Sequence, residues 1–111
     1  MNRQYSLKRN KEFQYVYRAG KSCATKNLVL IVARARHGSI RVGFSVSKKV
    51  GNSVVRNRVK RRLKECFRAQ MLAVKSGYSY IFVARPSAAE QPYAVLYRET
   101  STLLKRAGHL L

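Results

Sequence analysis

The stretch that decides the fold is residues 53–68, which read SVVRNRVKRRLKECFR. Ser53 is a typical N-cap residue, and the apolar spacing that follows predicts a helix running to about Ala73. At about 100° per residue, the apolar side chains fall within an arc of roughly 120°, as expected of a helix with one face on the core. These side chains are Val55, Val59, Leu63, Cys66 and Phe67. The stretch therefore predicts a long helix that supplies one wall of the core.

The remaining arc of this helix is basic. It carries Asn57, Arg58, Lys60, Arg61, Arg62, Lys64 and Arg68, while the angle of Arg56 places that side chain inside the edge of the apolar arc. A solvated helix face usually mixes charges of both signs, whereas Glu65 is the only acid here. Arg56 and Arg58 also lie in the first turn, where the helix dipole disfavours each cation by about 0.3–1 kcal/mol. Both features favour a polyphosphate ligand, to which the first-turn N–H groups add; a solvated basic face is the alternative.

The whole chain shares this positive charge. Its 111 residues hold 24 Lys and Arg but only 4 acids, which gives a formal net charge of +20. The acids are Glu12, Glu65, Glu90 and Glu99. Because they cannot neutralise the cations pairwise, the folded chain repels itself, and a bound polyanion would relieve that repulsion. Nucleic acid is the first candidate, since cations at its surface release condensed counterions, and an anionic membrane is the second.

Length and patterning indicate one soluble domain, residues 1–111, in the cytoplasm. The amino terminus does not read as a secretory signal, and the longest apolar run, residues 28–33, is far shorter than the roughly 20 residues that span a bilayer. Cys23 and Cys66 lie far apart and form no CxxC unit. We therefore expect two reduced thiols and neither a disulfide nor a metal pair.

A short helix is predicted at residues 11–18. Asn10 can cap its start and Gly20 can end it. Its side chains at helical spacing, which share one face, are Phe13, Val16 and Tyr17. Pro92 stands where a last helix begins, and that helix stops near Gly108. The apolar stripe of the last helix is Tyr93, Leu96, Tyr97, Thr100, Leu103 and Leu104.

Three segments predict the strands of a small sheet. Residues 27–36 and 40–46 predict two strands that form a hairpin about a turn at residues 37–39, and residues 78–84 predict a third strand. The element order is then α-β-β-α-β-α. This order predicts an α+β fold, a single-domain sandwich in which helices pack on a small sheet.

Several runs of residues resemble a known family. Beside the basic helix, the runs are Ser45-Val46-Ser47-Lys48-Lys49-Val50-Gly51-Asn52 and Val55-Arg56-Asn57-Arg58-Val59-Lys60-Arg61. Elsewhere they are Leu7 to Phe13 followed by Val16-Tyr17, and Ile81-Phe82-Val83-Ala84-Arg85-Pro86. With the length and the element order, these runs resemble the protein subunit of bacterial ribonuclease P over nearly the whole chain. A bare Arg-Asn-Arg triplet would be weak evidence, but the extended run in this element order is specific.

The resemblance implies a role in tRNA maturation. In that family the protein joins a large catalytic RNA, and the ribonucleoprotein removes the 5′ leader from precursor tRNA, with the protein broadening substrate use. The expected partners are therefore the ribonuclease P catalytic RNA, with one protein per RNA, and precursor tRNA, but neither DNA nor a membrane. The resemblance also implies a left-handed crossover between parallel strands around the basic helix, which is a rare connection.

The chain itself is expected to hold no catalytic residue, no metal and no cofactor. The resemblance implies that the RNA holds the Mg²⁺ needed for phosphodiester hydrolysis. Metal-dependent nucleases usually gather several carboxylates around their ions, whereas this chain has only scattered Glu residues. A histidine-based nuclease would need His37 and His109 to meet, and neither has clustered partners in the sequence.

Two RNA-binding surfaces follow from the resemblance. The basic helix would lie against the catalytic RNA through Arg56, Asn57, Arg58, Lys60, Arg61, Arg62, Lys64 and Arg68. A cleft between the first helix and the sheet would hold the single-stranded leader by aromatic stacking along a basic groove. Its residues would be Phe13, Tyr17, Arg41, Ser45, Lys48 and Lys49. The alternative is that Phe13 and Tyr17 simply pack on the sheet, and the family often has another aromatic where residues 30–32 read Leu-Ile-Val.

Three rival interpretations compete with this one. A ribosomal or other structural RNA-binding protein would share the size and the charge. A DNA-binding regulator would place the basic helix in the major groove, but such a helix usually follows another helix, and a strand is predicted before this one. A membrane-surface helix would turn its apolar arc to lipid, although the strands need that arc for a core.

Overall fold

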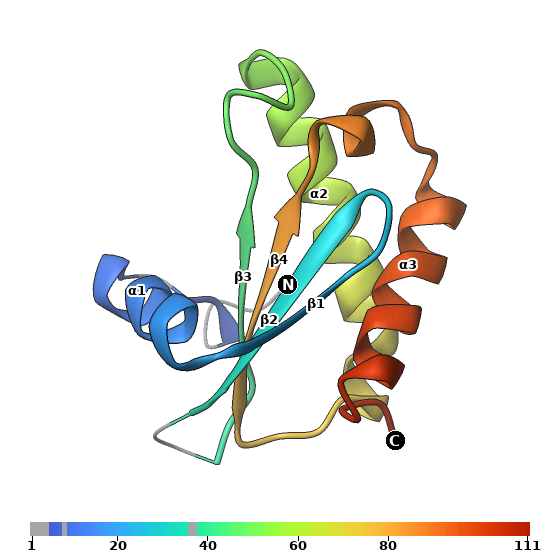
Figure 1. The fold of residues 1–111 in the computed structure, drawn as a ribbon. Coiled ribbons are helices and arrows are strands. Elements are labelled where there is room, and N and C mark those ends of the chain that lie inside the picture. The colour runs from blue at the N-terminus through green and yellow to red at the C-terminus, as the bar shows by residue number, and fades with distance from the viewer. Residues whose placement is uncertain (1–4, 8, 36–37) are drawn as a thin grey trace.

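The order of helices and strands follows the predicted pattern, with one strand added (Figure 1). The computed structural model describes residues 5–7, 9–35 and 38–111, so His37 of the predicted turn lies outside the described residues. The helices are α1 (Asn10–Ala19), α2 (Ser53–Gln70) and α3 (Tyr93–Arg106). The strands are β1 (Lys21–Ala24), β2 (Leu28–Arg34), β3 (Arg41–Ser45) and β4 (Tyr78–Ala84). Short 3₁₀ helices, η2 (Met71–Ala73) and η3 (Pro86–Glu90), follow α2 and β4. The α+β fold class is confirmed. The sequence did not predict β1, because its four residues show no apolar alternation.

The strands form a four-stranded sheet in the order β1-β2-β4-β3. β2 pairs antiparallel with both β1 and β4, and β3 pairs parallel with β4. The predicted hairpin between β2 and β3 is therefore wrong, because β4 lies between them. β4 suits this central place because its residues, YSYIFVA, are largely buried toward both faces of the sheet. Alternation within a strand identifies the side chains that face the core, but it carries no information about the neighbouring strand.

The chain passes from β3 through α2 to β4 in a left-handed crossover. In Figure 1 both strands run upward, α2 lies behind the sheet, and β4 lies to the right of β3. A right-handed connection behind the sheet would carry the chain to the left. The rare crossover that the family resemblance implied is therefore present, and it places the start of α2 beside the end of β3.

The sheet separates two cores of unequal size. α2 and α3 cover one face, while α1 crosses the other (Figure 1). Beneath α2 and α3, the rings of Phe44, Phe67, Tyr80 and Phe82 pack at centroid distances of 5.8–6.5 Å. Beneath α1, a smaller cluster joins Leu7, Val16, Ala33 and Ile81. The predicted core face of α2 is confirmed, with Val59, Leu63, Cys66 and Phe67 buried and Val55 packed against them at the margin.

Two predicted helix caps are displaced by one residue. Asn52, not Ser53, caps α2, because the Asn52 side-chain oxygen accepts a hydrogen bond from the N–H of Val55 at 3.0 Å. Asn10 is the first residue of α1 and not its cap, and Arg9 before it makes no side-chain capping bond. Asn and Ser have similar N-cap preferences, so the order Asn-Ser could not settle the boundary of α2.

The predicted apolar stripe of α3 divides into a buried part and an exposed part. The buried side chains are Leu96, Thr100, Leu103 and Leu104. Tyr93 and Tyr97 are instead 42% and 36% exposed, so their place in the buried stripe is a correction. Both lie at the edge of the stripe that faces α2, where a phenol can rest its ring on the protein and keep its hydroxyl in water.

Candidate nucleic-acid interface

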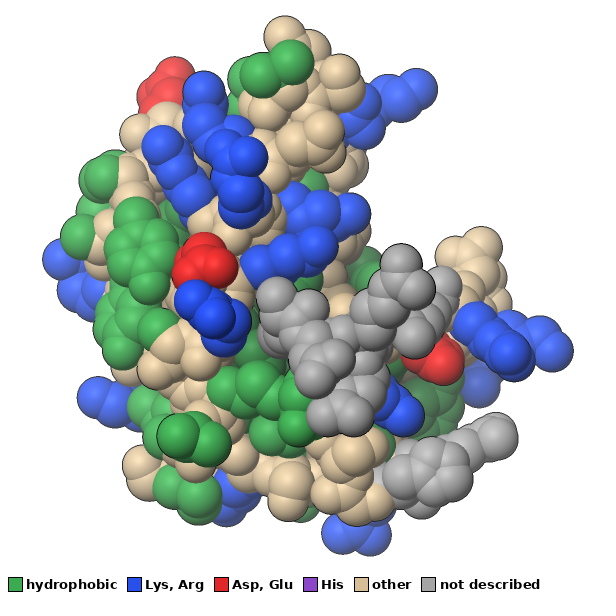
Figure 2. Space-filling view, turned by 180° about the vertical axis from the view of Figure 1, so that it is seen from behind, with side chains coloured by type: hydrophobic (Ala, Val, Ile, Leu, Met, Phe, Trp, Pro, Cys, Tyr) green, Lys and Arg blue, Asp and Glu red, His purple; other side chains and the backbone are tan. Residues whose placement is uncertain are grey.

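The first candidate surface is the basic side of α2. We call it the α2 basic surface, and it comprises Arg56, Asn57, Arg58, Lys60, Arg61, Arg62, Lys64 and Arg68. One helix carries all eight residues, so the structure brings them together as predicted. Asn57, Lys60, Arg61, Lys64 and Arg68 are exposed, whereas Arg56, Arg58 and Arg62 are half-buried. Figure 2 looks onto this side of the molecule and shows Lys and Arg side chains gathered in its upper half.

Two cations of this surface have partners among the described residues. The Arg62 guanidinium donates a hydrogen bond from Nη1 to the carbonyl oxygen of Gln91 at 2.9 Å, which ties α2 to the segment before α3. Arg68 forms a salt bridge with Glu65 at 3.3 Å, and both side chains are more than half exposed. Glu65 therefore pairs with Arg68. Because Glu65 is the only acid in α2, the other cations of this helix have no acidic partner on it.

The first two turns of α2 hold two arginines with unsatisfied donors. The Nε atoms of Arg56 and Arg58 are buried, and neither has a hydrogen-bond partner among the described residues. A buried charged donor without a partner is costly, whereas a phosphate oxygen would satisfy it. The sequence placed Arg56 inside the edge of the apolar arc of the helix and not on its basic arc. Its half-buried side chain agrees with that position. The pair is poised for an anion at the capped end of the helix.

The second candidate surface lies where α1 crosses the sheet. We call it the α1–sheet surface, and it comprises Phe13, Tyr17, Arg41, Gly43 and Ser45. The Phe13 ring lies directly over Gly43 of β3, because a Cβ atom on that glycine would stand 2.5 Å from Phe13 Cζ. Phe13 thus packs on the sheet, as the alternative interpretation held, whereas Tyr17 is 45% exposed. Of these two aromatic side chains, Tyr17 is the more accessible to a ligand.

Cations mark both ends of this surface. Arg41 opens β3, and Lys48 and Lys49 are exposed in the turn that follows the strand. At about 3.3 Å per residue, Arg41 and Ser45 lie roughly 13 Å apart on the same side of β3. The structure therefore spreads these predicted residues along a line, and the line leads from Arg41 to the first turn of α2.

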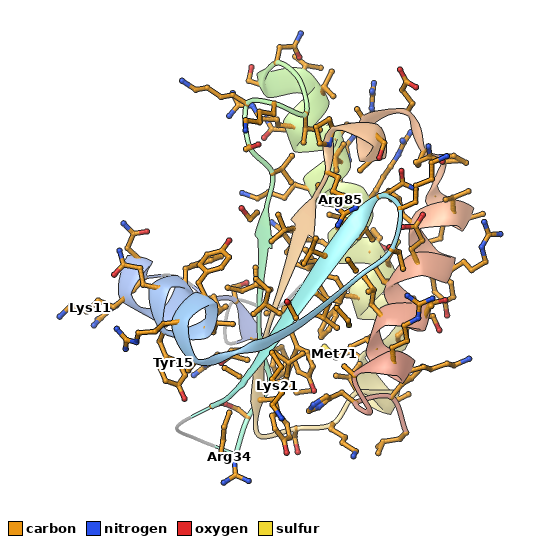
Figure 3. The ribbon with its side chains drawn as sticks, viewed as in Figure 1. Lys11, Tyr15, Lys21, Arg34, Met71 and Arg85 are labelled. Atoms are coloured by element: carbon orange, nitrogen blue, oxygen red, sulfur yellow. The ribbon has the colours of Figure 1, made fainter. Side chains whose placement is uncertain are left out.

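A cavity of about 590 Å³ lies at the Arg41 end. Sequence reasoning missed three of its basic residues, Arg9, Lys11 and Arg18, which come from α1 and the residue before it. Their separation in the sequence gave no hint that they meet Arg41. Tyr15 lines the same cavity. Figure 3 shows its side chain reaching from α1 toward the end of β2, where the hydroxyl donates to the carbonyl oxygen of Arg34 at 3.0 Å.

The Cys66 thiol and the Glu99 carboxylate are both engaged in structure. Burial raises the pKa of the Cys66 thiol to about 11, and both cysteines are free, as predicted. The Glu99 carboxylate accepts hydrogen bonds from Thr25 and Asn27. Within the described part of the chain, no three His, Cys, Asp or Glu side chains are grouped to hold a metal ion. No described helix has the length and apolar character to cross a membrane.

Known proteins resemble this chain in sequence and in structure. A family model described as "Ribonuclease P" matches residues 1–108. The "Ribonuclease P protein component" of Clostridium botulinum (strain 657 / Type Ba4) is 48% identical over 103 residues, which cover 92% of this chain and 93% of that one. Its namesake in Clostridium kluyveri is 44% identical over 106 residues, 94% and 95% of the two chains. A solved RNase P protein from Staphylococcus aureus superposes with a TM-score of 0.89 at 30% identity, covering 96% and 98%.

Proposed function

This chain belongs to the ribonuclease P protein family, and from that premise we propose that its two surfaces divide the binding of RNA between them. As a member, it is a component of the ribonucleoprotein endoribonuclease and acts with the RNA subunit in the 5′ processing of tRNA. We assign the catalytic RNA to the α2 basic surface. We assign the single-stranded 5′ leader of precursor tRNA to the α1–sheet surface and to Lys48 and Lys49.

The first assignment rests on the two buried Nε atoms of Arg56 and Arg58. Neither donor is satisfied within the described residues, and both lie at the capped end of α2. Phosphates of a structured RNA would satisfy them, and the exposed Lys60, Arg61 and Lys64 would release further counterions. The net charge of +20 adds long-range attraction for any RNA. These features support docking on a polyphosphate surface.

The second assignment rests on the line of residues along β3. Tyr17 offers an exposed ring for a base, and Phe13 fixes α1 at its distance from the sheet. Arg41, at one end, and Lys48 and Lys49, at the other, supply cations for the phosphates of an extended strand. Because the turn with Lys48 and Lys49 leads into α2, a leader on this surface would pass directly from the docked catalytic RNA.

The chemistry is assigned to the RNA. We propose that the protein supplies neither a catalytic residue nor a metal ligand, and that Mg²⁺ held by the RNA performs the hydrolysis. The protein would broaden substrate use, because contacts with the leader supplement those that the RNA makes with the tRNA. One protein per RNA would suffice, since a single chain carries both surfaces, and the cytoplasm is the expected compartment.

Reconstitution tests this assignment. The chain is added to the catalytic RNA at low Mg²⁺, and 5′ maturation of a precursor tRNA is followed. We expect the protein to restore cleavage and the RNA-free protein to cleave nothing. Lys105→Ala, which removes one exposed cation from α3, is the matched control for substitutions in α2. Mg²⁺-dependent cleavage by the RNA-free protein would overturn the division of labour, and recovery of ribosomal RNA alone in a pull-down would favour a ribosomal role.

A further inference from the structure

Two exposed tyrosines on α3 remain unexplained by either surface. The rings of Tyr93 and Tyr97 lie side by side with centroids 6.0 Å apart and planes tilted by 39°. They are 42% and 36% exposed, although both belong to the apolar stripe of the helix. Together the two rings offer flat apolar faces to a partner.

The backbone beneath the pair is firmly held. The Thr100 hydroxyl donates to the carbonyl oxygen of Tyr97 at 2.8 Å and accepts from Nε2 of Gln70 at 3.0 Å. Thr100 and Gln70 are buried, and Gln70 belongs to α2. Further along, the bond from Arg62 to the carbonyl oxygen of Gln91 anchors the segment just before Tyr93. The two rings therefore stand on a fixed part of the fold, which lowers the entropy lost when a ligand stacks on them.

The pair borders the α2 basic surface. Arg62 of α2 bonds to Gln91 at 2.9 Å, just before Tyr93, and Gln70 of α2 bonds to Thr100 at 3.0 Å, just after Tyr97. The Tyr93 hydroxyl also interacts electrostatically with Glu65 and Arg68 of α2. Glu65 is held by Arg68. In Figure 2, hydrophobic side chains and Lys and Arg side chains lie next to each other across this side of the molecule.

Charge decides the class of partner. On α3, Glu99 is engaged with Thr25 and Asn27, whereas Arg98 is exposed. Exposed Arg61 and Lys64 lie on the neighbouring helix. A nucleic acid combines flat bases with phosphates in one molecule and so matches both the rings and the cations. The leader is a poor candidate, because its proposed surface is on the opposite face of the sheet.

We propose that Tyr93 and Tyr97 form a stacking platform for an unpaired base of the RNA that occupies the α2 basic surface. The proposal rests on the assignment of the catalytic RNA to α2, and it extends that contact from α2 onto α3. Base stacking on an aromatic ring tolerates any base. The platform would therefore recognise an unstacked nucleotide in a loop or bulge, and not a sequence.

The test uses the full chain and the catalytic RNA without precursor tRNA. Tyr97→Leu keeps an apolar side chain but removes the ring, and Tyr97→Phe keeps the ring. We expect Tyr97→Leu to weaken binding by roughly five- to hundred-fold and Tyr97→Phe to bind as the parent does. The dependence of affinity on salt should not change for either variant, because no phosphate contact is lost. Equal affinity for all three proteins, or equal losses for both variants, would overturn the proposal.

A second measurement covers the case in which Tyr97→Leu perturbs folding. The chain contains no Trp, so Tyr97→Trp introduces a single indole, and its emission should be quenched when the RNA binds. If the indole emission is not quenched at saturating RNA, the proposal is wrong. The two tyrosines would then contact a protein partner or a second copy of this chain. Arg61→Ala is measured in parallel. If it reduces the salt dependence while the Tyr97 variants behave as the parent, the platform fails and the assignment of α2 stands; if Arg61→Ala also has no effect, that assignment fails.

Discussion

The Arg62 guanidinium donates a hydrogen bond to the carbonyl oxygen of Gln91 at 2.9 Å. Arg62 belongs to a run of cations that looks uniform in the sequence, yet this bond makes it part of the fold. Its neighbour Arg61 is exposed and has no such bond among the described residues. Two adjacent arginines of equal charge therefore have different roles, and they provide a matched pair for separating stability from RNA binding.

Removing the exposed Arg61 together with Arg58 should affect RNA binding, whereas removing Arg62 should affect stability. Arg58→Ala combined with Arg61→Ala is expected to weaken binding to the catalytic RNA and to reduce the slope of log affinity against log salt by roughly 0.7–0.9 per lost phosphate contact. Arg62→Ala is expected to lower the free energy of unfolding by about 1.5 kcal/mol, because it removes a charged donor from a carbonyl. Urea unfolding and titrations at several salt concentrations measure the two effects. An unchanged salt slope for the double variant would count against α2 as the contact.

Tyr17→Ala should affect precursor tRNA and not mature tRNA. Tyr17 is 45% exposed and its ring is free to stack, so its loss is expected to cost on the order of 1–3 kcal/mol in affinity for a substrate with a leader. Tyr17→Phe is the control and should bind as the parent does. The affinity of the reconstituted holoenzyme for each tRNA is the measurement, and equal losses for both substrates would refute a leader contact.

Gly43→Ala tests the contact between Phe13 and the sheet and should destabilise the fold. The added Cβ would stand 2.5 Å from Phe13 Cζ and 3.1 Å from Leu7 Cδ1, so α1 must shift, at a cost of about 1–3 kcal/mol in unfolding free energy. In a Phe13→Ala background the ring is absent, and the same substitution should cost much less. A double-mutant cycle in urea tests this coupling. Additive effects of the two substitutions would mean that the ring and the glycine do not meet.

The stability of the fold should depend on pH through Glu99. Burial raises the pKa of its carboxyl, but hydrogen bonds from the Thr25 hydroxyl and from both nitrogens of Asn27 outweigh burial and leave the pKa below its ordinary value. A folded-state pKa that is lowered stabilises the protein above the ordinary value of about 4.3, and this contribution is lost as the pH falls through the folded-state pKa.

Glu99→Gln makes the dependence on Glu99 measurable. We expect this variant to be less stable than the parent at pH 7, with a difference that shrinks below about pH 4.3. Glu90→Gln, at an exposed position, is the control and should leave the profile unchanged. Urea unfolding between pH 7 and pH 3 provides the profile. A difference between Glu99→Gln and the parent that stays constant over this range would contradict the role of the ionised carboxylate.

Much of the candidate site was accessible to prediction, because it depends on one helix. The α2 basic surface follows from residue spacing, since helical geometry places consecutive residues at known angles. The α1–sheet surface was predicted only in part. Arg41 and Tyr17 were named, but Arg9, Lys11 and Arg18 were missed, because they meet Arg41 only after α1 packs across the sheet. The exposure of Tyr93 and Tyr97 was missed for the same reason: a stripe on one helix does not reveal how much of its width the packed fold covers.

The sequence by itself determined which segments form helices and long strands, which face of α2 is buried, and how strongly the chain is charged. These properties depend on local spacing and composition. Only the tertiary structure decided that β4 separates β2 from β3, that Phe13 rests on Gly43, and that Arg62 is bound to Gln91 while Arg61 is not. Each of these contacts joins residues distant in the chain, and the packing of the whole core selects them, because many pairings satisfy the same local pattern.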